Sequence, residues 1–199
     1  RFQERRPRPI ALEIPTDLLG HEAEVEVLLP REANIVQGDP GRVEQALQEL
    51  LQAKRPLIVV GEEVQSQGGT QEIIRLAERI GAAVITTDGA KGAFPESHPL
   101  SLGTSLGKRI WGENPVQDWV TSCDVCLVLG STLPYRSTVG VDLKLPSNLI
   151  HVLLDEESIG KNYETPIPIV ANSQAVAVQL LQGIGNRDVS KGEDYRREI

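Results

Sequence analysis

Residues 55–87 read RPLIVVGEEVQSQGGTQEIIRLAERIGAAVITT, with two apolar runs on either side of a helical pattern. The first run, Pro56–Val60, is unbroken, which is typical of a parallel strand buried on both faces. After a loop rich in Gly, Ser and Gln, apolar residues at 73, 74, 77 and 80 predict a helix that ends at Gly81. The run Ala83–Thr87 predicts a second strand. These residues therefore predict one right-handed strand–helix–strand unit.

Similar patterns on both sides extend this unit into a larger sheet. The remaining expected helices cover 39–54, 114–121 and 173–181, with a helical turn at 16–19. The remaining expected strands cover 100–102, 124–129, 148–153 and 165–170, and another β-rich run lies at 10–14. We expect an α/β fold: a three-layer, Rossmann-like, doubly wound sheet of about six parallel strands in the order 3-2-1-4-5-6.

Composition narrows the classes of protein that the chain can belong to. Its 199 residues suit one domain of about 150 residues with flanking segments. The net charge of −8 argues against a nucleic-acid or anionic-membrane partner. No apolar run approaches the roughly 20 residues of a membrane span. We therefore expect a soluble, cytoplasmic protein with no nucleic-acid and no membrane partner.

The two cysteines and three histidines give no pattern for catalysis or metal binding. Cys123 and Cys126 form a C-x-x-C pair, but a redox pair favours a helix N-terminus, whereas this pair lies where a helix leads into a strand. Zinc would need a second pair. His21, His98 and His151 form no Ser/His/Asp grouping. We predict buried cysteines, structural histidines, no catalytic residue and no metal ligand.

Ligands of open parallel sheets bind at the carboxyl ends of the strands, which makes four loops candidates. Glycines there let backbone amides approach a phosphate, and an acidic residue can accept hydrogen bonds from ribose. Tight turns without any ligand need the same glycines, so both interpretations stay open. Two carboxylates in the first loop, however, oppose a pyrophosphate. The four loops are Gly61-Glu62-Glu63, Thr87–Lys91, Gly130–Thr132 and Asp155-Glu156.

Neither of two common phosphate-binding motifs is present in the sequence. The chain contains no G-x-G-x-x-G. The run Gly103–Arg109 resembles a phosphate loop, but it is one residue short and has Arg109 where the motif needs a hydroxyl.

Several segments, taken in order, resemble the central domain of thiamine-diphosphate-dependent enzymes, and within that family acetolactate synthase large subunits. The resemblance covers roughly residues 8–185. Residues 8–17 are similar to the closing strand of the pyrimidine-binding domain that precedes the central domain in this family. The segments that carry the resemblance are Arg55–Gly61, Ala77–Gly81, Thr86-Thr87, Lys91–Gly103, Cys123–Gly130 and Leu154–Asn162.

The resemblance implies a division of the chain and a set of cofactors. Residues 1–19 would be the tail of the pyrimidine-binding domain, 20–42 a linker, 43–184 the central Rossmann-like domain, and 185–199 a linker toward an absent diphosphate-binding domain. The parent enzyme would use thiamine diphosphate and Mg²⁺, held by the other domains, and would be a homodimer or tetramer. The family's magnesium motif is not matched: Thr87-Asp88-Gly89 with Asn114 lacks its leading glycine.

In the family, the central domain holds FAD, ADP or no nucleotide. Carried over position by position, the resemblance assigns cofactor contacts to Gly61, Gly130, Ser131, Arg136, Thr138, Gly140, Asp155 and Ile159. Where relatives have a glycine run, this chain has Gly61-Glu62-Glu63. The first hypothesis is a non-catalytic central domain of a carboligase or decarboxylase that acts on a 2-oxo acid, with FAD or ADP as candidate ligands. The alternative is a free-standing FAD- or NAD-binding module of the electron-transfer-flavoprotein kind.

Overall fold

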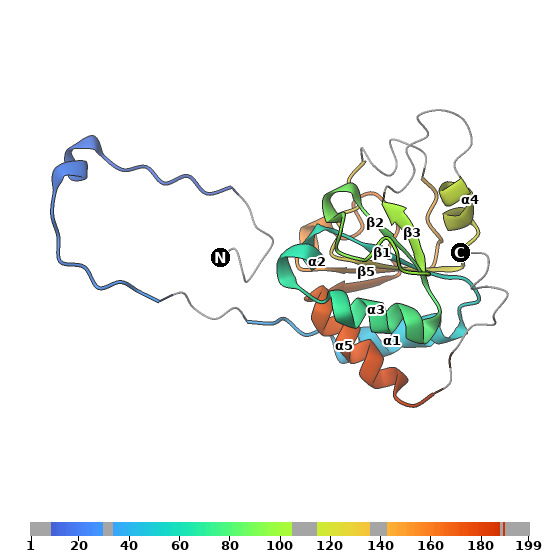
Figure 1. The fold of residues 1–199 in the computed structure, drawn as a ribbon. Coiled ribbons are helices and arrows are strands. Elements are labelled where there is room, and N and C mark those ends of the chain that lie inside the picture. The colour runs from blue at the N-terminus through green and yellow to red at the C-terminus, as the bar shows by residue number, and fades with distance from the viewer. Residues whose placement is uncertain (1–8, 30–33, 105–114, 136–142, 188, 190–199) are drawn as a thin grey trace. The chain divides into compact units, whose positions relative to one another are not determined.

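The structure is a computed structural model that describes residues 9–29, 34–104, 115–135, 143–187 and 189. The chain divides into two compact units, Arg1–Asn34 and Ile35–Ile199. The second unit contains a sheet with helices on its faces (Figure 1). No helix in the described part of the chain is both long and apolar enough to span a bilayer.

The second unit is built on a parallel sheet of six strands, as the sequence predicts. The order is β3-β2-β1-β4-β5-β6, and each neighbouring pair is parallel. The four inner strands are buried along their whole length, which explains their unbroken apolar sequences. Their bounds are Pro56–Val60 for β1, Ala83–Thr86 for β2, Ser101–Thr104 for β3, Val125–Leu129 for β4, Leu149–Leu153 for β5 and Ile167–Val170 for β6.

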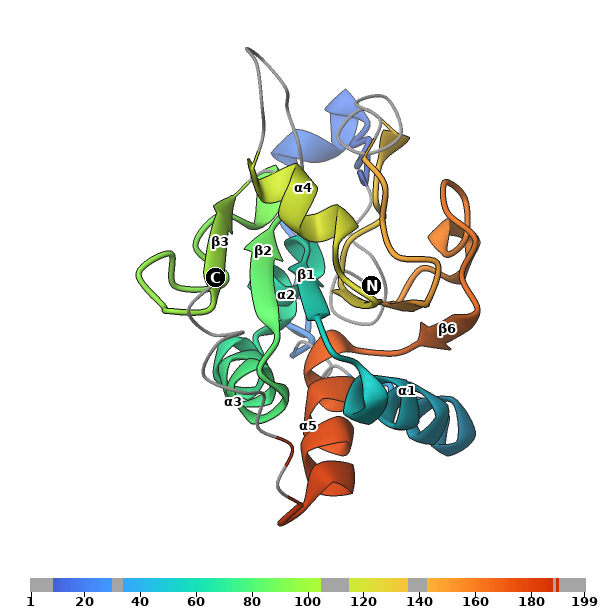
Figure 2. The ribbon, with the colours of Figure 1, turned by 90° about the vertical axis from the view of Figure 1, so that its right-hand side faces the viewer.

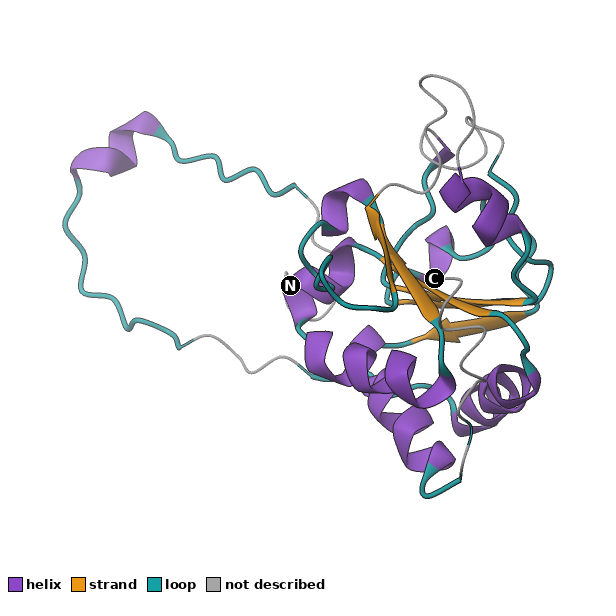
Figure 3. Cartoon of the chain, turned by 45° about the vertical axis from the view of Figure 1, so that its right-hand side comes forward, coloured by secondary structure: helices purple, strands orange, loops and turns teal. Residues whose placement is uncertain are grey.

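Helices cover both faces of the sheet (Figures 2 and 3), and on one face α5 (Ser173–Ile184) packs against both of its neighbours, α1 (Pro40–Gln52) and α3 (Thr70–Ile80). Their buried residues form one hydrophobic cluster with alternate strand residues such as Ile58 and Val60. The other face, with Leu57 and Val59, packs under α4 (Pro115–Thr121) and its neighbouring loops.

Local sequence signals set the helix ends. Asp39 caps α1, because its Oδ1 accepts a hydrogen bond from the backbone N–H of Arg42 at 2.9 Å. Pro40 occupies the first helical position, where its missing N–H costs nothing. Gly81 ends α3 with a φ of 63°, in the left-handed region that glycine adopts most easily.

One prediction about the first loop is wrong. The residues after β1 do not form an irregular loop: Glu62–Gln67 form the short helix α2. Only Glu63 and Val64 of this helix are buried, so its sequence lacks the apolar periodicity that predicts helices. Gly68, with a φ of 84°, follows its last residue.

The first unit has little regular structure among its described residues. The expected helical turn is confirmed as a 3₁₀ helix over Thr16–Gly20. The β-rich run at 10–14 forms no strand, because no second strand pairs with it in the described chain. Large apolar side chains in this unit are exposed, including Leu12, Val27 and Leu29.

Candidate functional site

The candidate loops lie at the carboxyl edge of the sheet, where the turns after β1, β2, β4 and β5 come together. The strand order changes direction between β1 and β4, because β2 and β3 lie to one side and β5 and β6 to the other. In open parallel sheets this switch point is where ligands bind. The backbone N–H of Gly61 continues the ladder here by donating to the Leu129 carbonyl oxygen at 2.8 Å.

Gly61 and Gly130 are needed because the turns after β1 and β4 touch. A Cβ added to Gly61 would lie 2.4 Å from the carbonyl oxygen of Gly130 and 2.4 Å from Cα of Ser131. A Cβ on Gly130 would lie 2.8 Å from Cβ of Glu63, and Gly130 also has a φ of 72°. Contact between the two turns therefore accounts for both glycines, without reference to a phosphate.

Glu62 and Glu63, the first two residues of α2, point toward different strands. Oε1 of Glu62 accepts a hydrogen bond from Oγ1 of Thr87 at 3.2 Å, in the turn after β2. Oε2 of Glu63 accepts a hydrogen bond from the backbone N–H of Leu154 at 3.2 Å, directly after β5. The two carboxylates thus lie on opposite sides of the β1–β4 switch point.

Glu63 is the buried member of the pair, with 6% of its surface exposed. Its Oε2 also accepts from Nε2 of Gln67, one turn later in α2, at 3.4 Å. Its backbone N–H donates to the carbonyl oxygen of Gly130 at 3.0 Å. A buried carboxylate is stable only when such donors surround it. Sequence reasoning identified the charge of Glu63 but not its burial, for which the sequence carries no signal.

The turn after β4 is fixed by hydrogen bonds inside the protein. Ser131 is fully buried, its Oγ accepts from the backbone N–H of Leu133 at 3.1 Å, and its carbonyl oxygen accepts from Nε2 of His151 at 2.7 Å. Leu133 has a φ of 45°, and its carbonyl oxygen accepts from Nδ2 of Asn162 at 2.8 Å. Burial lowers the pKa of His151, whereas the bond to Ser131 opposes that shift. His151 is thus a structural donor, as predicted.

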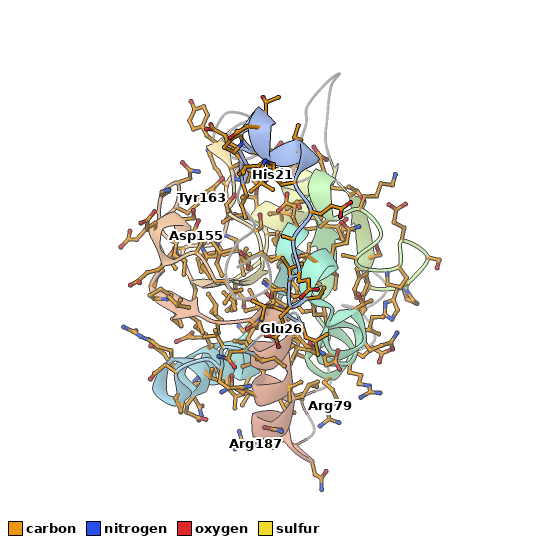
Figure 4. All side chains as sticks on the ribbon, turned by 90° about the vertical axis from the view of Figure 1, so that its left-hand side faces the viewer. His21, Glu26, Arg79, Asp155, Tyr163 and Arg187 are labelled. Atoms are coloured by element: carbon orange, nitrogen blue, oxygen red, sulfur yellow. The ribbon has the colours of Figure 1, made fainter. Side chains whose placement is uncertain are left out.

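Asp155 and Ile159 follow β5 and are both half-buried. Figure 4 views the molecule from the side on which α2 lies in Figure 1, and it labels Asp155. Oδ2 of Asp155 accepts from Oγ of Ser158 at 2.9 Å, so this oxygen holds the 3₁₀ turn Glu156–Ser158. Leu154 lies between this aspartate and the strand, and its N–H is the one that Glu63 binds.

The described residues contain neither the three remaining predicted cofactor contacts nor a group suited to a metal ion. Arg136, Thr138 and Gly140 lie outside the described residues, as does Asn114. Asp88 is exposed on a 3₁₀ turn, and the Glu62 side chain fills the space beside Gly89, where an added Cβ would lie 2.6 Å from Cγ of Glu62. Within the described ranges, no group of three or more His, Cys, Asp or Glu side chains could hold a metal ion.

Both cysteines are buried and free, as the sequence predicts. Burial raises the pKa of Cys123 to about 12, with Arg55 opposing the shift, and burial raises the pKa of Cys126 as well. Thiols held protonated in this way are poor nucleophiles. His98 has a structural role too, because its Nδ1 accepts from the backbone N–H of Leu100 at 3.2 Å.

Comparison with known proteins confirms the family resemblance. Residues 43–180 match the family model described as thiamine pyrophosphate enzyme, central domain. The protein named "Probable acetolactate synthase large subunit" from Methanocaldococcus jannaschii is 32% identical over 202 residues, which cover 98% of this chain and 34% of that protein. The acetolactate synthase large subunit of Corynebacterium glutamicum is 30% identical over 204 residues, covering 98% of this chain and 32% of that protein.

Solved structures show the same fold. Benzoylformate decarboxylase from Polynucleobacter necessarius superposes with a TM-score of 0.63 at 24% identity, covering 85% of this chain and 32% of that one. The chain thus spans about a third of the length of the curated relatives it matches. It belongs to the thiamine pyrophosphate enzyme family, and the part of that family which it represents is the central domain.

Proposed function

We propose that this chain is the non-catalytic central domain of a thiamine-diphosphate-dependent enzyme that acts on a 2-oxo acid, as an acetolactate-synthase-like carboligase or decarboxylase. The observation that carries the proposal is the alignment of almost the whole chain with about a third of acetolactate synthase large subunits. The role of the domain is to hold the neighbouring domains of the parent in place. The parent is a cytoplasmic homodimer or tetramer in this proposal.

Thiamine diphosphate and Mg²⁺ belong to the parent in this proposal, and the described residues of this chain do not fit them. The turn that comes nearest to a magnesium motif, Thr87-Asp88-Gly89, already has the Glu62 side chain packed against its glycine. We therefore assign the cofactor and its metal ion to the other domains, and no catalytic step to this chain.

Exposed apolar side chains support a scaffolding role for residues 9–29. Residues 22–27 of this segment alternate exposed acidic and apolar residues, as in Val25-Glu26-Val27, which suits one face of an extended strand. Large exposed apolar surfaces on soluble proteins mark contacts with other proteins or domains. We propose that this segment packs against another domain of the parent, the pyrimidine-binding domain for its first part.

The hypothesis also includes nucleotide binding. The geometry opposes binding of a diphosphate at the turn after β1. Asp155 remains a candidate for contact with a ribose, since it is half-buried at the end of β5. A diphosphate at the turn after β1 does not fit, because Glu63 is buried there. The family match also gives no support to a free-standing FAD or NAD module.

The test of the proposed function is a comparison of activities. The 199-residue chain, supplied with thiamine diphosphate and Mg²⁺, should consume neither pyruvate nor benzoylformate. The parent enzyme should consume at least one 2-oxo acid under the same conditions. Turnover by the chain alone would overturn the non-catalytic role, and a parent inert toward 2-oxo acids would overturn the assigned reaction class.

A further inference from the structure

The carboxyl edge of the sheet holds a buried carboxyl group that the chain itself supplies. Glu63 is almost completely buried, and its Oε2 accepts hydrogen bonds from the Leu154 N–H after β5 and from Nε2 of Gln67. These are the kinds of donor that would otherwise bind a phosphate oxygen at a switch point. A side-chain carboxylate therefore has the position and the bonding of a bound anion.

The backbone amides of the adjoining turns are engaged as well. The N–H groups of Gly61 and Glu63 donate to carbonyl oxygens of Leu129 and Gly130, and that of Val64 donates to Gly61. The N–H of Gly130 donates to the carbonyl oxygen of Val152 at 2.9 Å. A phosphate that used any of these four N–H groups would have to break a backbone hydrogen bond.

The two turns also pack closely against each other. The turns after β1 and β4 pack so closely that a single added Cβ on Gly61 would lie 2.4 Å from backbone atoms of the next turn. Cβ of Glu63 lies directly above Gly130, at 2.8 Å from where a Cβ of that glycine would stand. An incoming diphosphate would meet a carboxylate at close range, with like charges in a site partly shielded from water.

We infer that Glu63 permanently occupies the phosphate position of the switch point, so that this central domain works without the diphosphate of FAD, ADP or NAD. The inference rests on the proposed function and deepens it: the domain is a scaffold whose ligand edge is closed by its own side chain. Glu62, which turns toward β2 and Thr87, takes no part in this closure.

The test is a titration of the 199-residue chain with ADP and with FAD, in which calorimetry measures the binding. Wild type should show no saturable binding up to about 1 mM of either nucleotide. Glu63→Ala, which removes both the volume and the charge, should bind ADP saturably with a Kd below about 0.1 mM, at least about tenfold below the 1 mM limit set for wild type, because like charges a few ångströms apart repel strongly. Glu63→Gln keeps the shape and removes the charge, so it should show a smaller gain.

Glu62→Ala is the matched control, because it removes an equal charge from the neighbouring residue. It should show no gain in affinity. Micromolar binding by wild type would overturn the inference, and so would an equal gain for Glu62→Ala. Circular dichroism and the thermal midpoint establish whether each variant is folded. If Glu63→Ala does not fold, Glu63→Gln provides the test in its place. Absence of any gain in folded Glu63 variants would also overturn the inference.

The two proposals fail in different experiments. Failure of the proposed function appears as turnover of a 2-oxo acid by the chain alone. Failure of the present inference appears as nucleotide binding by wild type, whether or not the chain has activity.

Discussion

Replacing Gly61 by alanine separates a packing role for this glycine from a ligand-binding role. Gly61 has a φ of −110°, which alanine adopts without strain, so the change acts only through the added methyl group. That methyl would lie 2.4 Å from the Gly130 carbonyl oxygen, whereas ordinary contacts begin at 3.4 Å. The turns after β1 and β4 must therefore separate by about 1 Å.

The cost follows from what this separation breaks. Overpacking a well-filled site costs about 1–3 kcal/mol, and losing the Gly61–Leu129 hydrogen bond adds about 1 kcal/mol. We expect the free energy of unfolding to fall by about 2–4 kcal/mol, which lowers the thermal midpoint of a domain of this size by about 5–15 °C. Urea unfolding followed by circular dichroism measures the first quantity, and a thermal scan measures the second.

Gly20→Ala is the control, because an added Cβ at Gly20 has nothing within 4 Å. It should leave the midpoint within about 1 °C of wild type. If Gly61→Ala were equally neutral, the close approach of the two turns would not be what requires glycine here. Close packing of the two turns would then not exclude a phosphate either.

Three other sites give predictions of the same kind. Asp124 accepts from the backbone N–H groups of Lys54 at 2.6 Å and Arg55 at 2.9 Å, so Asp124→Ala should lower the free energy of unfolding by about 1–2 kcal/mol in urea titrations, with Asp124→Asn recovering part of it. Cys123, whose pKa burial raises to about 12, should not react with Ellman's reagent at pH 8 until the protein unfolds, and rapid labelling of native protein would contradict this. Burial lowers the pKa of His151 below 6.5, so the unfolded chain takes up the proton first as the pH falls. Stability should decline below about pH 6.5, by at most about 1.4 kcal/mol per pH unit, and His151→Gln should lose this component in urea titrations at pH 7.5 and 5.5.

The sheet could be predicted from sequence because its inner strands are buried on both faces. An uninterrupted run such as Leu127–Leu129 has few alternatives once glycine bounds it. The edge strand β3 was harder to place: it is only half-buried, and its register with β2 shifts between Val84 and Thr86. The predicted range, 100–102, is accordingly displaced from the observed Ser101–Thr104.

The position of the candidate site could be predicted from the sequence, but the burial of Glu63 and the presence of α2 could not. Glycines after strands and the reversal of strand order identify the edge. The sequence also shows that Glu63 opposes a pyrophosphate there. It cannot show that this residue is buried, because glutamate is usually exposed, or that α2 exists, because the helix has only Val64 as a buried apolar residue.

The contacts of α2 explain why so short and polar a helix is stable and what it connects. Oε1 of Gln67 accepts from Nδ2 of Asn172 at 3.2 Å, and Asn172 in turn exchanges hydrogen bonds with both backbone groups of Val36. A polar chain thus runs from Glu63 to the segment that leads into α1. Because the hydrogen bonds of one network are energetically coupled, a change at Glu63 should loosen the hold of Asn172 on Val36. The hydrogen bonds of α2 therefore connect the turn after β1 to the segment by which the chain approaches the sheet.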